Sequence, residues 1–92
     1  MISEHDKAAI IELARRYEVG AILLFGSSVR PEGVGNDIDL AVDGIPPERF
    51  FDFYGDLIFS LSKPVDLVDL RRDSRFNRLV RKEGVRLYER SA

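Results

Sequence analysis

The chain has 92 residues, no cysteine and a formal net charge of −2. A chain of this length forms one small domain, so we expect a single domain over residues 1–92. The absence of cysteine excludes disulfides and thiolate metal sites, and no apolar run is long enough to span a membrane. Because the first residues lack the basic and apolar regions of a signal peptide, the sequence predicts a cytoplasmic protein.

An amphipathic helix is predicted before Gly20, which is expected to end it. Ser3 can cap its N-terminus, and Glu4 and Asp6 are favourably placed near the positive end of the helix dipole. Its apolar positions recur three and four residues apart, at Ile10, Leu13, Ala14 and Tyr17. His5 has no partner at metal-ligand spacing, so we assign it no catalytic role.

A strand, a turn and a second strand are predicted next. The apolar run over residues 21–25 stops at Gly26, and a second apolar run opens at Asp37. Because side chains alternate across a strand, Asp37 and Asp39 lie on the same face, about 6.6 Å apart. The opposite face of this strand is apolar and carries Ile38, Leu40 and Val42.

Carboxylates inside a strand need an explanation, because Asp is uncommon there. A role at the strand end accounts for Asp37, which follows the loop, but not for Asp39 within the apolar run. Two converging carboxylates repel each other and favour a bound cation, and oxygen ligands suit Mg²⁺. The Asp pair therefore predicts a metal site.

The turn before these carboxylates suits phosphate binding. Gly26 lets the backbone approach a ligand closely or adopt a positive φ. The residues up to Arg30 can form one helical turn, whose free N–H groups, with the Ser27 hydroxyl, would hold phosphate oxygens. A metal on the carboxylates would bridge those oxygens to the reacting phosphorus. The combination indicates nucleotide chemistry.

Phe25-Gly26-Ser27, nine further residues and then Asp37-Ile38-Asp39-Leu40 resemble the signature of the DNA polymerase β-like nucleotidyltransferases. Members often have Arg three residues after the Ser and a third carboxylate in a later Val-Asp-Leu-Val strand. The corresponding residues here are Arg30 and Asp66. The short chain resembles the minimal nucleotidyltransferases (MNT), which implies one minimal nucleotidyltransferase domain over residues 1–92.

The resemblance also implies a site, a reaction and a partner. The implied catalytic and metal-binding residues are Asp37, Asp39 and Asp66, with two Mg²⁺ ions, and Asp66 would help to activate the acceptor hydroxyl. The implied nucleotide-binding residues are Gly26, Ser27 and Arg30, with ATP as donor. MNT proteins commonly work with a HEPN-domain toxin. The implied function is therefore that of an antitoxin that transfers AMP to a hydroxyl on a HEPN-type partner.

Two other functions remain open. The protein could neutralise its partner by docking alone, with a vestigial site, although the intact carboxylates argue against this. Transfer to a small-molecule hydroxyl, such as that of an aminoglycoside, needs an acceptor pocket that larger relatives build from an additional domain.

A helix and a third strand follow the Asp pair. Pro46 and Pro47 open the helix, and its apolar stripe is Phe50, Phe53, Tyr54, Leu57, Ile58 and Leu61. Phe59 falls opposite this stripe. In the strand over residues 65–70, we expect Asp66 to face the site, because its two neighbours then face the core.

The last helix is predicted to begin with Asp73 as its cap and to end at Gly84. Three residues are expected to face inward: Phe76, Leu79 and Val80. A basic stripe runs down the outer side: Arg71, Arg75, Arg78 and Lys82. Such a stripe is usually a solvated face, so an acidic partner is an alternative and direct nucleic-acid binding is not favoured. Residues 85–89 form a short extended ending.

These elements define an α/β (α+β) fold. The first two strands have a short connection and should be antiparallel, and a helical crossover should place the third strand beside the second. We therefore expect a small mixed β-sheet with helices packed on its apolar face. The carboxylates would lie on the other face.

Overall fold

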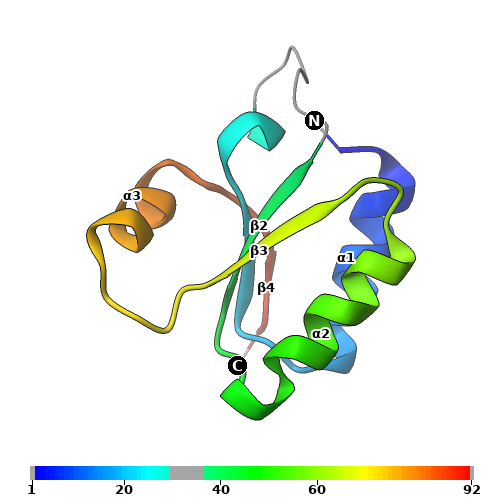
Figure 1. The fold of residues 1–92 in the computed structure, drawn as a ribbon, viewed down its shortest axis with the longest axis horizontal. Helices are drawn as coiled ribbons and strands as arrows, with labels where there is room; N and C mark the ends of the chain where they lie inside the picture. The colour runs from blue at the N-terminus through cyan, green and yellow to red at the C-terminus, as the bar shows by residue number, and fades with distance from the viewer. Residues whose placement is uncertain (1, 30–36, 92) are drawn as a thin grey trace.

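Four strands form one mixed sheet in the order β3-β2-β1-β4. The computed structural model describes residues 2–29 and 37–91 (Figure 1). Its elements are α1 (Glu4–Arg16), β1 (Ala21–Leu24), the 3-10 turn η1 (Gly26–Val29), β2 (Ile38–Asp43), α2 (Pro47–Ser60), β3 (Val65–Asp69), α3 (Arg75–Glu83) and β4 (Val85–Glu89). No helix in the described ranges is long and apolar enough to cross a membrane.

The strand pairing confirms the predicted fold class. β1 and β2 are antiparallel, β2 and β3 are parallel, and Asp39 is the Cα partner of Asp66. The predicted extended ending is a strand, since β4 pairs antiparallel with β1 from Ala21 opposite Glu89 to Leu24 opposite Val85. The helical crossover through α2 therefore brings the third carboxylate beside the second strand.

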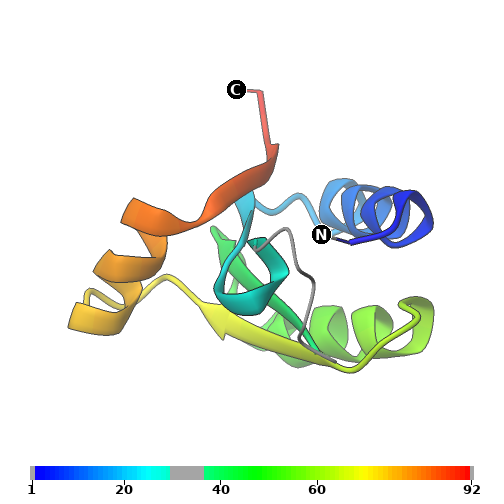
Figure 2. The ribbon, with the colours of Figure 1, turned by 90° about the horizontal axis from the view of Figure 1, so that it is seen from above.

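Helices α1 and α2 cover one face of the sheet (Figures 1 and 2). The apolar stripe of α1 is buried as predicted, and the Ser3 hydroxyl accepts a hydrogen bond from the Asp6 N–H at 3.1 Å. Helix α1 ends earlier than predicted, because Glu18 already adopts a positive φ of 56°. Gly20 instead donates its N–H to the carbonyl oxygen of Asp43 at 2.7 Å.

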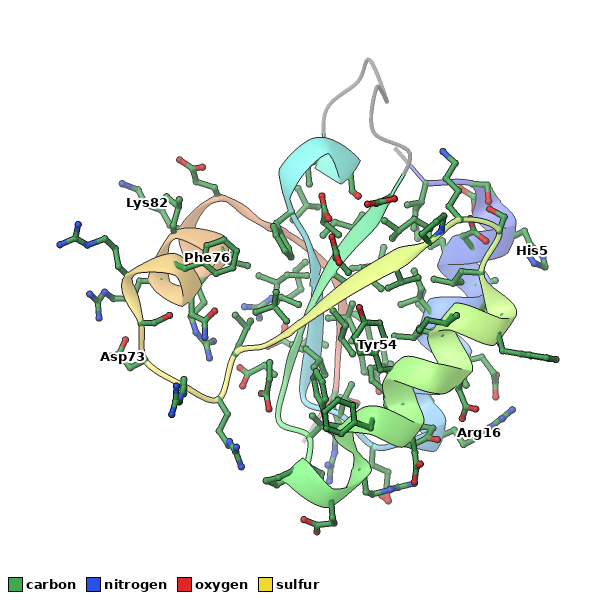
Figure 3. All side chains as sticks on the ribbon, in the orientation of Figure 1. His5, Arg16, Tyr54, Asp73, Phe76 and Lys82 are labelled. Atoms are coloured by element: carbon green, nitrogen blue, oxygen red, sulfur yellow. The ribbon has the colours of Figure 1, made fainter. Side chains whose placement is uncertain are left out.

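The stripe of α2 is buried or half-buried at five of its six predicted positions. Phe53 and Leu57 are fully buried, and the Tyr54 hydroxyl reaches across to the Val65 carbonyl at 2.8 Å (Figure 3). Ile58 was predicted to belong to this stripe, which is wrong, because its side chain is 56% exposed. Phe59 is 91% exposed, so its predicted place opposite the stripe is confirmed.

Helix α3 lies on the opposite side of the sheet from α1 and α2, where Val80 packs in a small second core (Figure 2). The prediction that the helices pack on one face is therefore wrong for α3. Phe76 and Leu79 were predicted to face inward with Val80, but they are not buried, because their side chains are 51% and 50% exposed. The sheet residues of the second core include the small Ala21 and Ala41, and the exposed pair borders a cavity instead.

The N-terminus of α3 also differs from the prediction. Ser74 is the capping residue, because its hydroxyl accepts the Asn77 N–H at 3.0 Å. Asp73 instead pairs with Arg78 at 2.9 Å on the surface. The basic stripe is exposed along its whole length.

A buried carboxylate that sequence reasoning missed ties α1 to the loop after α2. Asp6 is 2% exposed and accepts hydrogen bonds from the backbone N–H of Ser62 at 3.0 Å and from its hydroxyl at 2.6 Å. Burial acts to raise the pKa of Asp6, but the hydrogen bonds from Ser62 favour the ionised form, and the net effect lowers this pKa below its ordinary value of 3.8.

We expect Asp6→Asn to lower the free energy of unfolding by about 1–3 kcal/mol at neutral pH, as for a lost hydrogen bond to a charged group. A lowered folded-state pKa contributes stability that is present above the unfolded-state pKa and is lost as the pH falls through the folded-state value. Urea unfolding should therefore show a smaller difference between the two proteins at about pH 2.5 than at pH 7. An equal difference at both pH values would contradict a role for the charge.

Candidate active site

The sheet register brings two of the three predicted carboxylates together. Asp39 and Asp66 are directly opposite each other on parallel strands, whose backbones lie about 4.8 Å apart. Their strand neighbours Ile38, Leu40 and Val65 are buried in the core on the other face. Asp39 and Asp66 therefore point to the face away from α1 and α2. The predicted orientation of Asp66 is confirmed, since it is exposed between two buried residues.

The structure describes the third predicted carboxylate, Asp37, but only some of the predicted nucleotide-binding residues. Asp37 is exposed and stands directly before β2, two residues from Asp39. Arg30 lies outside the described residues, and the side chain of Ser27 is not described. The structure thus places Asp37, Asp39, Asp66 and the backbone of Gly26.

The turn at Gly26 lies directly against one of these carboxylates. Gly26 has a φ of +62°, and a Cβ atom at this position would come within 2.5 Å of Asp39 Oδ2. That separation is far below an ordinary contact, so a larger residue would displace the carboxylate or the turn. Gly26 therefore gives the turn its left-handed conformation and leaves the space that Asp39 occupies.

A second serine in this turn fixes the position of Asp39. The Ser28 hydroxyl accepts the backbone N–H of Asp39 at 2.9 Å, and Ser28 is only 7% exposed. The Phe25 N–H donates to the Asp39 carbonyl oxygen at 3.1 Å, which ties the end of β1 to the same residue. Ser28 is thus a positioning residue that sequence reasoning missed, and the adjacent Ser-Ser pair is the signal that could have indicated it.

The chemistry of this donor set fits Mg²⁺. Among residues 2–29 and 37–91, no three His, Cys, Asp or Glu side chains are grouped so that they could hold a metal ion. Mg²⁺ is usually bound by one or two protein carboxylates together with substrate phosphates and water. The paired Asp39 and Asp66 supply such carboxylates, and the backbone of Gly26 lies directly against the Asp39 carboxylate.

A cavity of about 400 Å³ opens on the other flank of the turn. Residues of η1, of the segment before it and of α3 line this cavity: Phe25, Gly26, Val29, Phe76, Leu79, Val80 and Glu83. Most of its wall is apolar. Since Gly26 borders the cavity and also contacts Asp39, the cavity adjoins the carboxylate site.

A mixed sheet with carboxylates on two neighbouring strands beside a glycine turn defines a nucleotidyltransferase fold. The family model described as polymerase beta, nucleotidyltransferase matches residues 8–92. The chain therefore belongs to the polymerase beta nucleotidyltransferase family, as its motifs predicted. No curated protein matches its sequence.

Solved structures of toxin–antitoxin pairs resemble the chain over most of its length. A MntA–HepT toxin–antitoxin structure matches with a TM-score of 0.71 and 28% identity, over 96% of this chain and 74% of that one. A toxin–antitoxin structure with AMP-PNP matches with a TM-score of 0.74 and 31% identity, over 91% and 73%. The complex of a tri-AMPylated HEPN toxin from Shewanella oneidensis with its MNT antitoxin matches with a TM-score of 0.69 and 28% identity, over 92% and 71%.

Proposed function

We propose that the protein is a Mg²⁺-dependent nucleotidyltransferase that transfers AMP from ATP to a hydroxyl on a HEPN-type partner protein, as an antitoxin. The observation that carries this proposal is the pairing of Asp39 with Asp66 beside the Gly26 turn. The similar structures support the donor and the acceptor, because one contains AMP-PNP and another an AMPylated HEPN toxin. We place the reaction in the cytoplasm, where ATP is supplied.

Each predicted site residue has a role in this reaction. Three carboxylates would hold Mg²⁺, two ions in the full site: Asp37, Asp39 and Asp66. Three residues would hold the triphosphate: Gly26, Ser27 and Arg30. When bound, Mg²⁺ would neutralise the charge on the phosphate oxygens. Ser28 keeps Asp39 in register by accepting its backbone N–H, and so holds one ligand of the site in place.

The reaction exchanges one bond to phosphorus for another. The oxygen of the acceptor hydroxyl attacks the α-phosphorus of ATP, and the bond from this phosphorus to the oxygen shared with the β-phosphate breaks. Pyrophosphate leaves with that electron pair, and the AMP becomes an ester of the acceptor. Asp66 is exposed at the edge strand β3, where an incoming hydroxyl can reach it and transfer its proton.

Intact-mass spectrometry tests this proposal. The protein is co-expressed with the product of its neighbouring gene, and the purified pair is incubated with ATP and Mg²⁺. We expect an AMP-sized mass increment on the partner, which should be absent when EDTA replaces Mg²⁺. A partner that remains unmodified under both conditions would contradict the proposal.

Docking without transfer is a second candidate function, favoured by the outer side of α2. This side exposes three large apolar residues: Phe51 at 79%, Ile58 at 56% and Phe59 at 91%. Several large apolar side chains exposed on one helix form a candidate surface for contact with another protein.

We expect Phe59→Asp to leave the isolated protein folded, because Phe59 makes no core contact, and to weaken binding of the partner. Circular dichroism checks the fold, and size-exclusion chromatography of the mixed proteins checks association. If neutralisation of the partner is lost in Phe59→Asp but kept in Asp39→Asn, docking alone accounts for it. Unchanged association in Phe59→Asp would exclude this surface.

A further inference from the structure

We propose that the cavity between η1 and α3 binds the nucleobase of the donor nucleotide, and that it selects a base with an exocyclic amino group, such as adenine. The inference rests on the proposed function, because it assigns the part of the donor that the carboxylates and the Gly26 turn leave unassigned.

The position of the cavity supports this assignment. Gly26 is part of the cavity wall and lies against Asp39, so the cavity continues directly from the proposed phosphate site. In the strand order β3-β2-β1-β4, Asp66 lies on one side of Asp39, whereas Gly26 follows β1 on the other side. A nucleotide whose phosphates lie at Asp39 can therefore extend its base toward α3. The Asp66 flank then remains open for the acceptor.

The walls of the cavity have the chemistry that a base requires. The rings of Phe25 and Phe76 meet edge to face, with centroids 5.8 Å apart and an interplanar angle of 82°. Phe76 is nevertheless 51% exposed, and Figure 3 shows its ring on the side of α3 that faces the sheet. A half-exposed aromatic ring beside an apolar wall offers a stacking surface for a base. The volume of about 400 Å³ lies within the range of ligand pockets.

One charged residue borders this otherwise apolar cavity. Glu83 is the last residue of α3 and part of the lining. A carboxylate accepts hydrogen bonds and donates none when it is ionised. It therefore favours a base that presents an exocyclic amino group, as adenine does. Glu83 is thus the candidate residue for donor specificity.

Calorimetric binding of two probes separates the base from the phosphates. The probes are Mg²⁺-ATP and Mg²⁺-tripolyphosphate, and the variant is Phe76→Ala. We expect the affinity for ATP to fall by about tenfold, because the base loses the ring on which it stacks. The affinity for tripolyphosphate should stay unchanged, because this probe has no base. Phe51→Ala is the matched control, since Phe51 is an exposed phenylalanine on α2 far from the cavity, and it should change neither affinity.

The possible outcomes distinguish this inference from the proposed function. An unchanged affinity of Phe76→Ala for ATP would overturn the inference and leave the proposed function standing. An equal loss for both probes would also overturn it, because Phe76 would then only support the fold of the site. Failure of the native protein to bind either probe would overturn the proposed function, and the inference with it.

Replacement of Glu83 tests the specificity. The native protein should bind ATP more tightly than purine riboside triphosphate, which lacks the exocyclic amino group. In Glu83→Gln, whose amide retains an acceptor oxygen without the charge, this preference should shrink, and in Glu83→Ala it should disappear. An undiminished preference in Glu83→Ala would exclude Glu83 as the specificity residue.

Discussion

Asp39→Asn should abolish transfer of AMP and leave the fold intact. The substitution removes a carboxylate charge at nearly constant volume, and the backbone bonds of residue 39 to Ser28 and Phe25 do not depend on that charge. Even a residue behind a metal ligand costs about 10–100-fold when it is replaced, so the loss for a ligand should exceed about 100-fold.

The rate of AMP incorporation into the partner measures this effect. Asp43→Asn is the matched control, because Asp43 lies on the same strand but pairs with Arg81 at 3.0 Å instead of facing Asp66. It should transfer AMP at the native rate, since an exposed ion pair contributes little to stability. Full activity in Asp39→Asn, with the control equally active, would exclude Asp39 from the site.

Gly26→Ala should reduce the transfer of AMP as much as Asp39→Asn does, because it changes the geometry of the site instead of its charge. The new methyl group would meet Asp39 Oδ2 at 2.5 Å, so the carboxylate or the turn must move. The positive φ of Gly26 adds a cost of about 1–2 kcal/mol in stability for a residue with a Cβ atom. We therefore expect a loss of transfer of about 100-fold or more, since a small misplacement of a catalytic group has such effects.

The same substitution elsewhere provides the control. Gly55 lies within α2, and a Cβ atom there would meet nothing within 4 Å. Gly55→Ala should keep full activity and raise the free energy of unfolding by about 1 kcal/mol, because Ala favours the helix. Thermal unfolding and the transfer assay measure both variants. Native activity in Gly26→Ala would show that the contact with Asp39 is unimportant.

The alternation of side chains in strands predicted much of this site correctly. Asp39 and Asp66 stand inside apolar runs, so only one orientation keeps the apolar neighbours in the core, and both face away from it. The parallel pairing that sets Asp39 opposite Asp66 followed from a short turn and one helical crossover. Local patterns were sufficient here because the residues on either side of each carboxylate in its strand are buried on the opposite face.

Features that depend on distant residues could not be predicted in this way. Helical spacing indicated which side of α3 is apolar, but not that the sheet opposite it would leave a cavity beside Phe76. Asp6 resembled an ordinary first-turn acid, because its partner Ser62 follows 56 residues later. The hydrogen bond from the Asp39 N–H to Ser28 depends on the path of the turn, which the sequence does not specify.

Strand β1 pairs on one edge with a strand close to it in the sequence and on the other edge with a strand near the C-terminus. This difference affects which part of the sheet separates first. β1 pairs with the nearby β2, but its other edge is covered only by β4, where Ala21 lies opposite Glu89. β4 is an edge strand with no fully buried residue, so it has the least apolar burial to hold it in place. Brief detachment of β4 would expose a fully apolar strand edge, which is a template for pairing with another chain. Aggregation of this protein on storage should therefore begin at β1.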